Sequence, residues 1–314
     1  MATFANFSEL QAHYQPLLAA QWHAVAQQSQ NRLADTVTIK PLSGAETHID
    51  QILPTEMTPK TGRMAPTVLG EMDYNKRFIY AQEFEGAKGF DEFDAAKFTS
   101  QSLPLMETLN EFSKANHRKA EQIIIESIQG TAFEGAVTPT AVNLPASQVI
   151  DLDLARTGSP TNIGLTYTKI ARLRRLAMEN EVFGQGVEDG SEQLCIATTA
   201  SGLEDLFHDV YANNKDYVTA VGKLRDGEVD TFLGVRFVRT EQLTKRDIGG
   251  GVMVADNLAW IRSGVCFGYR DNYTSDIAQR KDLSNATQIR VTSAMGGSRL
   301  EESKVWKLPC LITA

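Results

Sequence analysis

The clearest pattern of apolar and polar positions predicts one long helix. Apolar residues recur there at spacings of three and four, which places them on one helical face. They are Leu105, Leu109, Phe112, Ala120, Ile123, Ile124 and Ile128. Ser102 is a candidate N-cap, Pro104 falls in the first turn, and Gly130 is a candidate stop. We therefore predict a helix from Ser102 to Gln129, which is about 40 Å long at a rise of about 1.5 Å per residue.

Two extended runs before this helix predict a β-hairpin. The runs are Pro66–Glu71 and Lys76–Phe84, and Asp73-Tyr74-Asn75 between them contains the turn formers Asp and Asn. Neither alternating set of the second run is fully apolar, so the hairpin lacks a core of its own. We expect it to rest on a neighbour, either within the chain or on another subunit.

The N-terminal residues 1–35 read as a helix with an uneven apolar stripe, interrupted at Pro16. The opposite face is rich in Gln and Ala and carries few charges. This segment is therefore predicted to be an arm that lies against another surface.

The rest of the chain mixes helices and strands. A second helix is predicted over 166–181, with an apolar face and a basic side. The basic residues are Lys169, Arg172, Arg174 and Arg175. They form either a solvated, salt-bridged face or a contact for nucleic-acid phosphates. Short strands are predicted at 36–39, 194–197, 232–238, 287–291 and 305–308, with a turn at Gly296-Gly297 joining the last two. This mixture predicts an α+β fold.

Composition and charge argue against several classes of protein. The chain has 314 residues, 42% of them hydrophobic, and 31 basic against 39 acidic residues give a net charge of −8. Such an acidic protein is a poor binder of the nucleic-acid backbone. Cys195, Cys266 and Cys310 are too far apart for a disulfide framework or a zinc site. With no signal peptide or apolar spanning segment visible, a cytoplasmic, soluble protein is expected.

No motif indicates catalysis or a cofactor. His208, beside Asp205 and Asp209, is the only local acid–base cluster, and its helical spacing is typical of a solvated pair. The cysteines lie in apolar runs, where a thiol acts as a small core hydrophobe. The Gly-rich loop 183–192 lacks the third glycine of a dinucleotide fingerprint and follows a helix rather than a strand. We expect no cofactor and no metal.

Several stretches, in this order, carry a resemblance over nearly the whole chain. They are Arg63 ahead of the hairpin, RFIYAQEF from Arg77 to Phe84, KAEQIIIESIQGTAFEG at 119–135, LPASQVID at 144–151, GLTYTKIARLRRLAMEN at 164–180, LGVRFVRTEQL at 233–243 and VWKLPCLI near the end. Together with the arm, the coreless hairpin and the long helix, they are similar to the major capsid protein of tailed double-stranded DNA bacteriophages. That family has the Hong Kong 97-type capsid fold.

The resemblance implies four segments and one function. Residues 1–57 correspond to the N-arm, 58–95 to the E-loop, 96–150 with 266–314 to the peripheral domain that contains the spine helix, and 151–265 to the axial domain. The function implied is self-assembly, as pentamers and hexamers, into the icosahedral shell that encloses the phage DNA. The inter-subunit contacts implied are Arg63, Asp73, Asn75, Arg77, Tyr80 and Glu83.

The partners implied are other copies of the chain, a scaffolding protein and a portal, with a decoration protein as an option. Contact with packaged DNA would be non-specific, and no membrane is involved. The location implied is the virion, after assembly in the host cytoplasm. Two alternatives stay open: an encapsulin-type compartment shell, which shares the fold, and a hydrolase that uses an acidic pair and His208.

Overall fold

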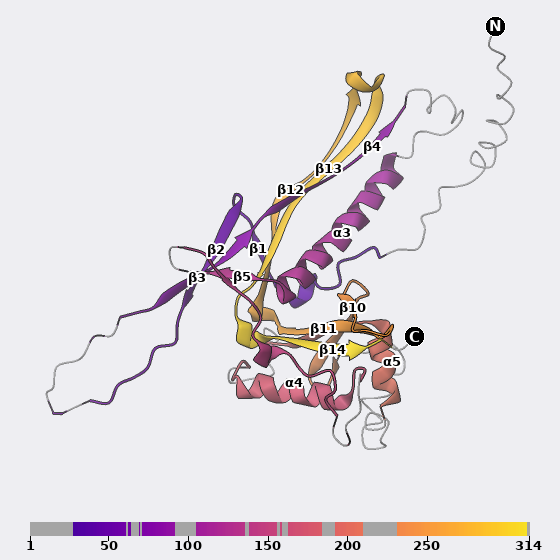
Figure 1. The fold of residues 1–314 in the computed structure, drawn as a ribbon. Helices are drawn as coiled ribbons and strands as arrows, with labels where there is room; N and C mark the ends of the chain where they lie inside the picture. Colours follow the sequence, from indigo (N-terminus) through magenta and orange to yellow (C-terminus); the bar gives the residue numbers. More distant parts are fainter. Residues whose placement is uncertain are drawn as a thin grey trace, which may run out of the picture. The chain divides into compact units, whose positions relative to one another are not determined.

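The structure, a computed structural model, describes residues 28–60, 62–63, 69, 71–91, 105–135, 138–155, 158, 163–183, 192–209 and 231–312 (Figure 1). They belong to two compact units. Unit 1 takes its described elements from Gln82–Ala120 and Arg270–Met295, and unit 2 from Arg32–Ala81, Glu121–Tyr269 and Gly296–Ala314. Helix and strand occur in both units, so the predicted α+β class is confirmed. The predicted arm, E-loop, peripheral and axial boundaries remain predictions.

The larger sheet of unit 2 has six strands, with the order β10-β11-β7-β9-β8 and with β14 also paired to β11. These strands are β7 (Leu194–Thr198), β8 (Thr231–Phe232), β9 (Val235–Arg239), β10 (Lys245–Asp247), β11 (Met253–Ile261) and β14 (Val305–Leu311). Every residue of β7 is buried, as is typical of a strand covered on both faces. The single strand predicted over 232–238 is wrong, because a tight turn at Leu233-Gly234, with positive φ at both residues, separates β8 from β9.

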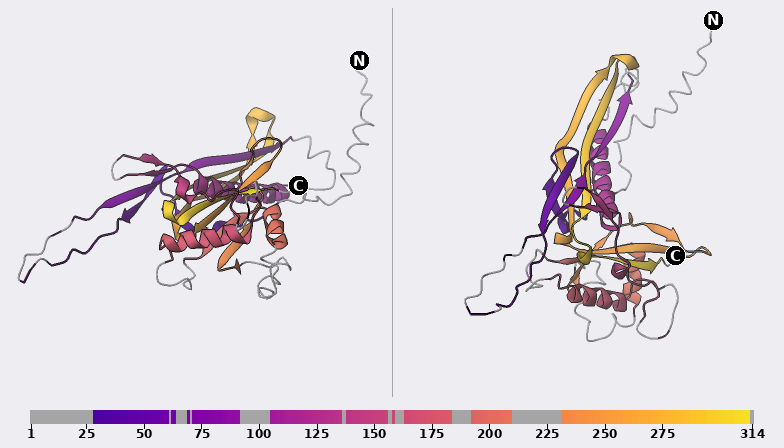
Figure 2. Two further views of the ribbon diagram at one scale, coloured as in Figure 1. Left: turned by 60° about the horizontal axis from the view of Figure 1, so that its bottom comes forward. Right: turned by 60° about the vertical axis from the view of Figure 1, so that its left-hand side comes forward.

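Two helices of unit 2 contribute to the core of this sheet (Figure 2). They are α4 (Tyr167–Glu179) and α5 (Ala200–His208), and the predicted helix over 166–181 is confirmed in α4. Ile170 and Leu173 of α4 and Leu206 of α5 pack in one cluster with Ile196 and Trp306 of the sheet, and all five are at most 1% exposed. Thr199 caps α5, because its hydroxyl oxygen accepts a hydrogen bond from Gly202 N at 3.2 Å.

The smaller sheet of unit 2 has the order β2-β3-β5-β6. Its strands are β2 (Glu46–Ile52), β3 (Tyr74–Tyr80), β5 (Ala132–Glu134) and β6 (Thr140–Val142). We call the antiparallel pair of β2 and β3, which runs from Glu46↔Tyr80 to Ile52↔Tyr74, the ribbon. We call residues 53–73 the loop. The predicted hairpin turn at Asp73–Asn75 is wrong, because Tyr74 already begins β3, which pairs with β2 at 46–52. Most of the strand predicted over 66–71 lies outside the described residues.

The long helix α3 runs from Leu105 to Gln129. Its predicted end is confirmed, and Gly130 N donates to Glu126 O at 2.7 Å just after the last turn. The predicted start at Ser102 lies outside the described residues. Ile123, Ile124 and Ile128 are at most 6% exposed, in agreement with the predicted apolar face.

A third sheet has the order β1-β12-β13-β4. Its strands are β1 (Thr38–Pro41), β4 (Gln82–Phe90), β12 (Val265–Arg280) and β13 (Ala286–Arg299). In unit 1, β4 pairs with β13 from Gln82↔Met295 to Phe90↔Thr287. In unit 2, β1 runs parallel to the first residues of β12. The run predicted as one strand from Lys76 to Phe84 is therefore divided at Ala81, and its second part belongs to a different sheet.

The glycines at 296 and 297 do not form the predicted turn. Both lie inside β13, and neither has a positive φ. A Cβ at Gly296 would lie 2.3 Å from Tyr80 O, and one at Gly297 would lie 2.9 Å from Ser127. Glycine is required here because another segment approaches the strand closely.

The described part of the N-terminal segment is not the predicted helix. Residues 28–33 have no helical turn, residues 34–36 form the 3-10 helix η1 (Ala34–Thr36), and residues 1–27 lie outside the described residues. Trp260 Nε1 donates to Thr36 O at 2.9 Å, which anchors this segment in unit 2. The other 3-10 helices in the described ranges are η2 (Ala146–Gln148), η4 (Arg262–Gly264), η5 (Lys281–Leu283) and η6 (Glu302–Lys304). None of the helices in the described ranges is long and apolar enough to cross a membrane.

Candidate functional site: the ribbon and its buried charge cluster

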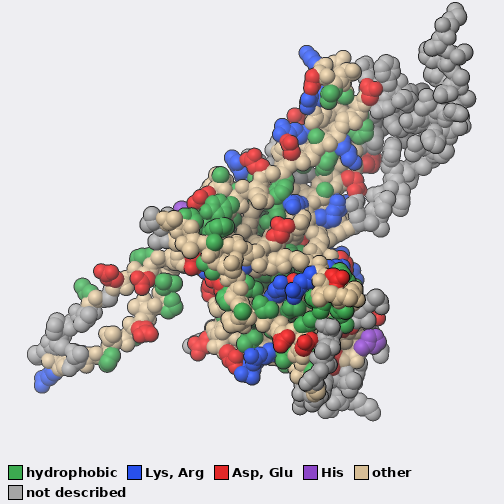
Figure 3. All heavy atoms as spheres, in the orientation of Figure 1, with side chains coloured by type: hydrophobic (Ala, Val, Ile, Leu, Met, Phe, Trp, Pro, Cys, Tyr) green, Lys and Arg blue, Asp and Glu red, His purple; other side chains and the backbone are tan. Residues whose placement is uncertain are grey.

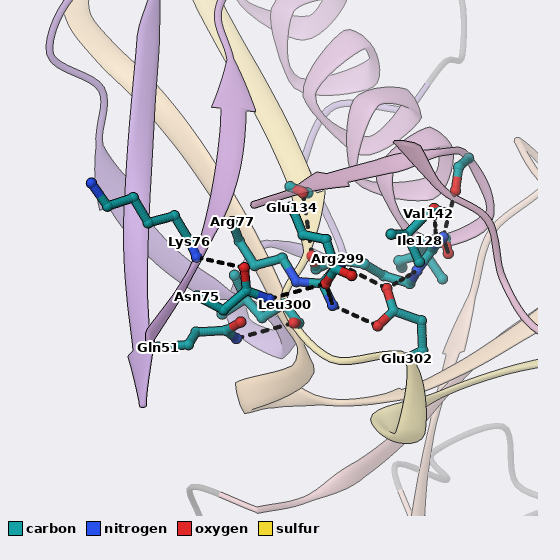
Figure 4. A network of polar contacts seen from close by, with 12 residues as sticks. Gln51, Asn75, Lys76, Arg77, Ile128, Glu134, Val142, Arg299, Leu300 and Glu302 are labelled. Carbon is teal, nitrogen blue, oxygen red and sulfur yellow. Dashed lines mark hydrogen bonds and ion pairs between the residues drawn. The ribbon is translucent and has the colours of Figure 1, made fainter. Parts of the chain in front are cut away.

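A cluster of four charged side chains lies at the root of the ribbon (Figure 4). We call Arg77, Glu134, Arg299 and Glu302 the charge cluster. Arg77 of β3 makes a two-pronged contact with Glu302, with Nη1 to Oε1 at 2.9 Å and Nη2 to Oε2 at 2.6 Å. Arg77 Nη2 also lies 2.8 Å from Glu134 Oε2, on the neighbouring strand β5. Paired guanidinium–carboxylate contacts of this kind fix direction as well as distance.

Arg299, at the end of β13, is fully buried and holds several chain segments together. Its Nη1 donates to the carbonyls of Ile128 and Gly130 at the end of α3, and its Nη2 donates to Val142 O in β6 at 3.0 Å. Carbonyls at a helix C-terminus favour such a cation. Arg299 Nε lies 3.6 Å from Glu302 Oε1. Burial lowers the pKa of the Arg299 guanidinium, and the Glu302 carboxylate opposes this shift.

Both strands of the ribbon contact the segment 299–302. Gln51 Nε2 of β2 donates to Leu300 O at 3.0 Å, next to the Arg77–Glu302 contact from β3. Gln51 is directly opposite Asn75 in the ribbon, and Asn75 Nδ2 donates to Glu134 Oε2 at 3.2 Å. An apolar layer continues the same contact, since Ile49 and Ile79 pack with Leu300. The inner face of the ribbon is therefore fixed by charge, amide and apolar contacts.

The loop at the other end of the ribbon exposes apolar side chains (Figure 3). The exposed apolar residues on the described part of the loop and its two flanks are Ile52, Leu53, Met57, Leu69, Met72 and Tyr74. Met57 is 99% exposed and Leu69 90%. Isolated exposed apolar residues are common, but a run of them in one segment without a core indicates a surface that another molecule covers.

The six residues predicted as inter-subunit contacts fall into three groups. Arg63 and Asp73 lie exposed in the loop. Tyr80 and Glu83 are exposed beyond the root, where Tyr80 stacks edge-on against Phe133 and Glu83 lies 3.8 Å from Arg270.

Asn75 and Arg77 form the third group, because both contact acidic residues of their own chain. Arg77 is only 5% exposed. Arg77 therefore has an internal role, and its predicted contact with a neighbouring subunit remains a prediction.

Other candidate residues have structural roles. His208 is exposed, and its Nε2 lies 3.9 Å from Glu204 Oε1. The three cysteines are buried and unpaired, and burial raises the pKa of Cys195 to about 12 and those of Cys266 and Cys310 to about 11. Within the described ranges no group of His, Cys, Asp and Glu could hold a metal ion.

The predicted basic side of α4 has one buried member. Lys169 is 0% exposed, and its Nζ donates to Ile163 O at 2.8 Å and to Pro309 O at 2.9 Å. Burial lowers its pKa. Arg175 stays on the surface and pairs with Glu179 at 2.6 Å, as a salt-bridged face predicts.

Sequence reasoning missed Arg299 and Glu302. Both lie within a run of mostly polar and small residues, SAMGGSRLEESK, that looks like a surface turn. The only available signal was Arg77 itself, a charged residue directly before the apolar residues Phe78 and Ile79. A charge in a buried strand requires a partner of opposite charge.

A family described as phage capsid protein matches residues 10–312 by its sequence profile. The chain belongs to this family. It is a major capsid protein, which forms an icosahedral shell, and it is a component of the virion. No curated protein sequence matches the chain.

Solved structures of other phage capsid proteins share the fold. The capsid of Ralstonia phage GP4 is similar with a TM-score of 0.68 and 12% identity, covering 100% of this chain and 99% of that one. The head structure of Helicobacter pylori bacteriophage KHP40 gives 0.67 and 9%, and the capsid of cyanophage Pam1 gives 0.66 and 14%, each covering 99% of both chains. The predicted Hong Kong 97-type fold is confirmed for this capsid protein.

Proposed function

We propose that this capsid protein assembles as pentamers and hexamers through the loop of its ribbon. The observation that carries the proposal is the run of exposed apolar side chains from Ile52 to Tyr74. Burying apolar surface stabilises an interface by about 25 cal/mol per Å², and a closed shell repeats each contact many times. Arg63 and Asp73, both exposed in the loop, add charges that set the register with the neighbouring copy.

The shell encloses double-stranded DNA without gripping it. The net charge of −8 supports this, and on α4 Lys169 is buried and Arg175 pairs with Glu179. Assembly takes place in the host cytoplasm, with a scaffolding protein and a portal as partners and a decoration protein as an option. The protein acts structurally and not as an enzyme, and the exposed His208 supports this reading.

The test compares exposed apolar side chains of the loop, changed in a double variant, with one exposed apolar side chain of α4, changed in a single variant. Met57→Ser with Leu69→Ser should change the free energy of unfolding of the monomer by less than about 0.5 kcal/mol, because neither side chain packs against the rest of the chain. Thermal melting measures this change. Shells seen by negative-stain electron microscopy and light scattering should disappear. The matched control is Met178→Ser on α4, which is 50% exposed and should assemble normally.

Two results would contradict the proposal. One is normal assembly of the loop variant, and the other is an equal loss of assembly in the Met178→Ser control. Analysis of native particles then separates the two kinds of shell, because DNA inside indicates a virion whereas a defined cargo protein indicates an encapsulin-type compartment.

A further inference from the structure

The strands of the ribbon do not need Glu302 in order to pair. β3 is hydrogen-bonded to β2 over seven residue pairs and to β5 at Arg77↔Glu134 and Phe78↔Phe133. Glu134 is thus the cross-strand partner of Arg77 within the sheet. Glu302 approaches from outside the sheet, from a helical turn 225 residues later in the chain.

We propose that Glu302 is a positioning residue for shell assembly, which holds the inner face of the ribbon on segment 299–302 and so sets the direction of the loop. The proposal rests on the proposed function, because it assumes that the loop meets a neighbouring copy. It adds that Glu302, although remote from the loop, controls whether the loop contacts the neighbouring copy.

Glu302 has this role because it is shared by two buried guanidinium groups. Its two oxygens contact Arg77 at 2.9 and 2.6 Å, and Oε1 also lies 3.6 Å from Arg299 Nε. The side chains of Arg77 and Arg299 are 6% and 0% exposed, so water cannot replace the carboxylate.

Without Glu302, the two guanidinium groups would lie near each other with Glu134, on the Arg77 side, as the one carboxylate left in the charge cluster. The positive charge of Arg77 already opposes the protonated state of Arg299. Arg299 is held by the carbonyls of Ile128, Gly130 and Val142, whereas Arg77 lies on the ribbon. Repulsion between them should therefore move the ribbon rather than Arg299.

The neighbouring Glu301 provides a matched control. It is one residue away, and it pairs with Lys304 at 2.9 Å through a side chain that is 43% exposed. Ion pairs near the surface contribute little to the free energy of folding. Glu301→Gln and Glu302→Gln are the same isosteric change, but only the second removes the buried charge between two arginines.

The experiment measures assembly, folding and the state of the ribbon in the full chain. Glu302→Gln should raise the concentration needed for shell formation by about tenfold or more, as a loss of 1.4 kcal/mol per contact would, whereas Glu301→Gln should not change it. Fluorescence of the buried Trp260 and Trp306 should stay native in both variants.

Trypsin gives a readout of the ribbon itself. Wild-type monomer should be cut in the loop, after the exposed Lys60 and Arg63, and Glu302→Gln should also be cut at the root, after Lys76 or Arg77. Adding Arg77→Gln to Glu302→Gln removes the repulsion and should restore part of the assembly.

A second variant keeps the proposal open to refutation if Glu302→Gln does not fold. Arg77→Lys keeps the charge but loses the two-pronged contact. This variant should fold, but it should assemble less well than wild type. The proposal is overturned if Glu302→Gln folds and assembles like wild type, or if Arg77→Lys does. If the ribbon root opens to trypsin while assembly is unchanged, the proposed use of the loop in assembly fails as well.

Discussion

At its root the ribbon packs charged side chains inside the protein, whereas the loop that leaves its other end exposes apolar ones. Arg77 and Arg299 are 5% and 0% exposed, but Met57 and Leu69 are 99% and 90% exposed. This is the reverse of the usual arrangement. The root must adopt one geometry in the single chain, and directional ion pairs give it one. Under the proposed function, the apolar loop becomes buried only in the assembled shell.

The largest effect should come from removing a charge at the root. Arg299→Met keeps much of the side-chain length but leaves three carbonyls without their donor and removes one of the two cations beside Glu302, so we expect a loss of about 3–5 kcal/mol in the free energy of unfolding. Urea unfolding followed by tryptophan fluorescence measures this loss. The control Arg290→Met removes a surface ion pair with Glu85 and should cost at most about 1 kcal/mol. Equal losses in the two variants would contradict the internal role of the charge cluster.

A smaller effect should come from adding one methyl group beside the ribbon. Gly296→Ala places its Cβ 2.3 Å from Tyr80 O, where backbone cannot yield easily, and should destabilise the chain by about 1–3 kcal/mol. Gly89→Ala, in β4, meets no atom within 4 Å and should be nearly neutral. Thermal melting of the two variants decides whether β13 and the end of β3 pack as closely as described; identical melting temperatures would argue against it.

The smallest change in stability should come from a thiol in the loop. Leu69→Cys should alter the free energy of unfolding by less than about 0.5 kcal/mol and react at once with a thiol reagent at pH 8. Cys266, which packs with Leu300 and Ile79 at the root, should not react, because it is buried and its pKa is raised to about 11. Cys266 reacting as fast as the new thiol would remove the contrast between root and loop.

The buried thiols also predict a pH dependence. The fold keeps Cys195, Cys266 and Cys310 protonated, whereas thiols of the unfolded chain ionise near 9.0. Above pH 9 the folded chain therefore binds more protons than the unfolded one, and its stability should fall as the pH rises toward 11. Urea titrations at pH 8 and pH 10 test the sign; a more stable protein at pH 10 would contradict it.

The sequence predicts the elements whose signal is local. The end of α3 at Gly130, the helix α4 and the buried strand β7 follow from periodicity and capping, and all three are confirmed. The partner of β3 does not follow, because the alternating ETHIDQI of β2 carries too few apolar residues to mark a strand. Gly296 and Gly297 indicate a turn by themselves, and only the neighbouring Tyr80 shows why glycine is needed.

The charge cluster is harder still to predict from the sequence. Its members come from β3, β5, β13 and η6, and no spacing along the chain relates Arg77 to Glu302. The same holds for Lys169, whose carbonyl partners include Pro309 on β14. A buried charge can be identified from the sequence only when its partner is local, and neither of these partners is.

The separation of Arg77 from Glu302 also has a consequence in time. The two residues are 225 positions apart, so a ribosome adding about 5–20 residues per second makes Glu302 about 10–45 s after Arg77. During that interval the nascent ribbon has its apolar loop but lacks the carboxylate that fixes its direction. On a polysome, many copies of the chain are made close together. The delay would prevent incomplete chains from joining a growing shell, so that only chains whose synthesis has passed residue 302 assemble.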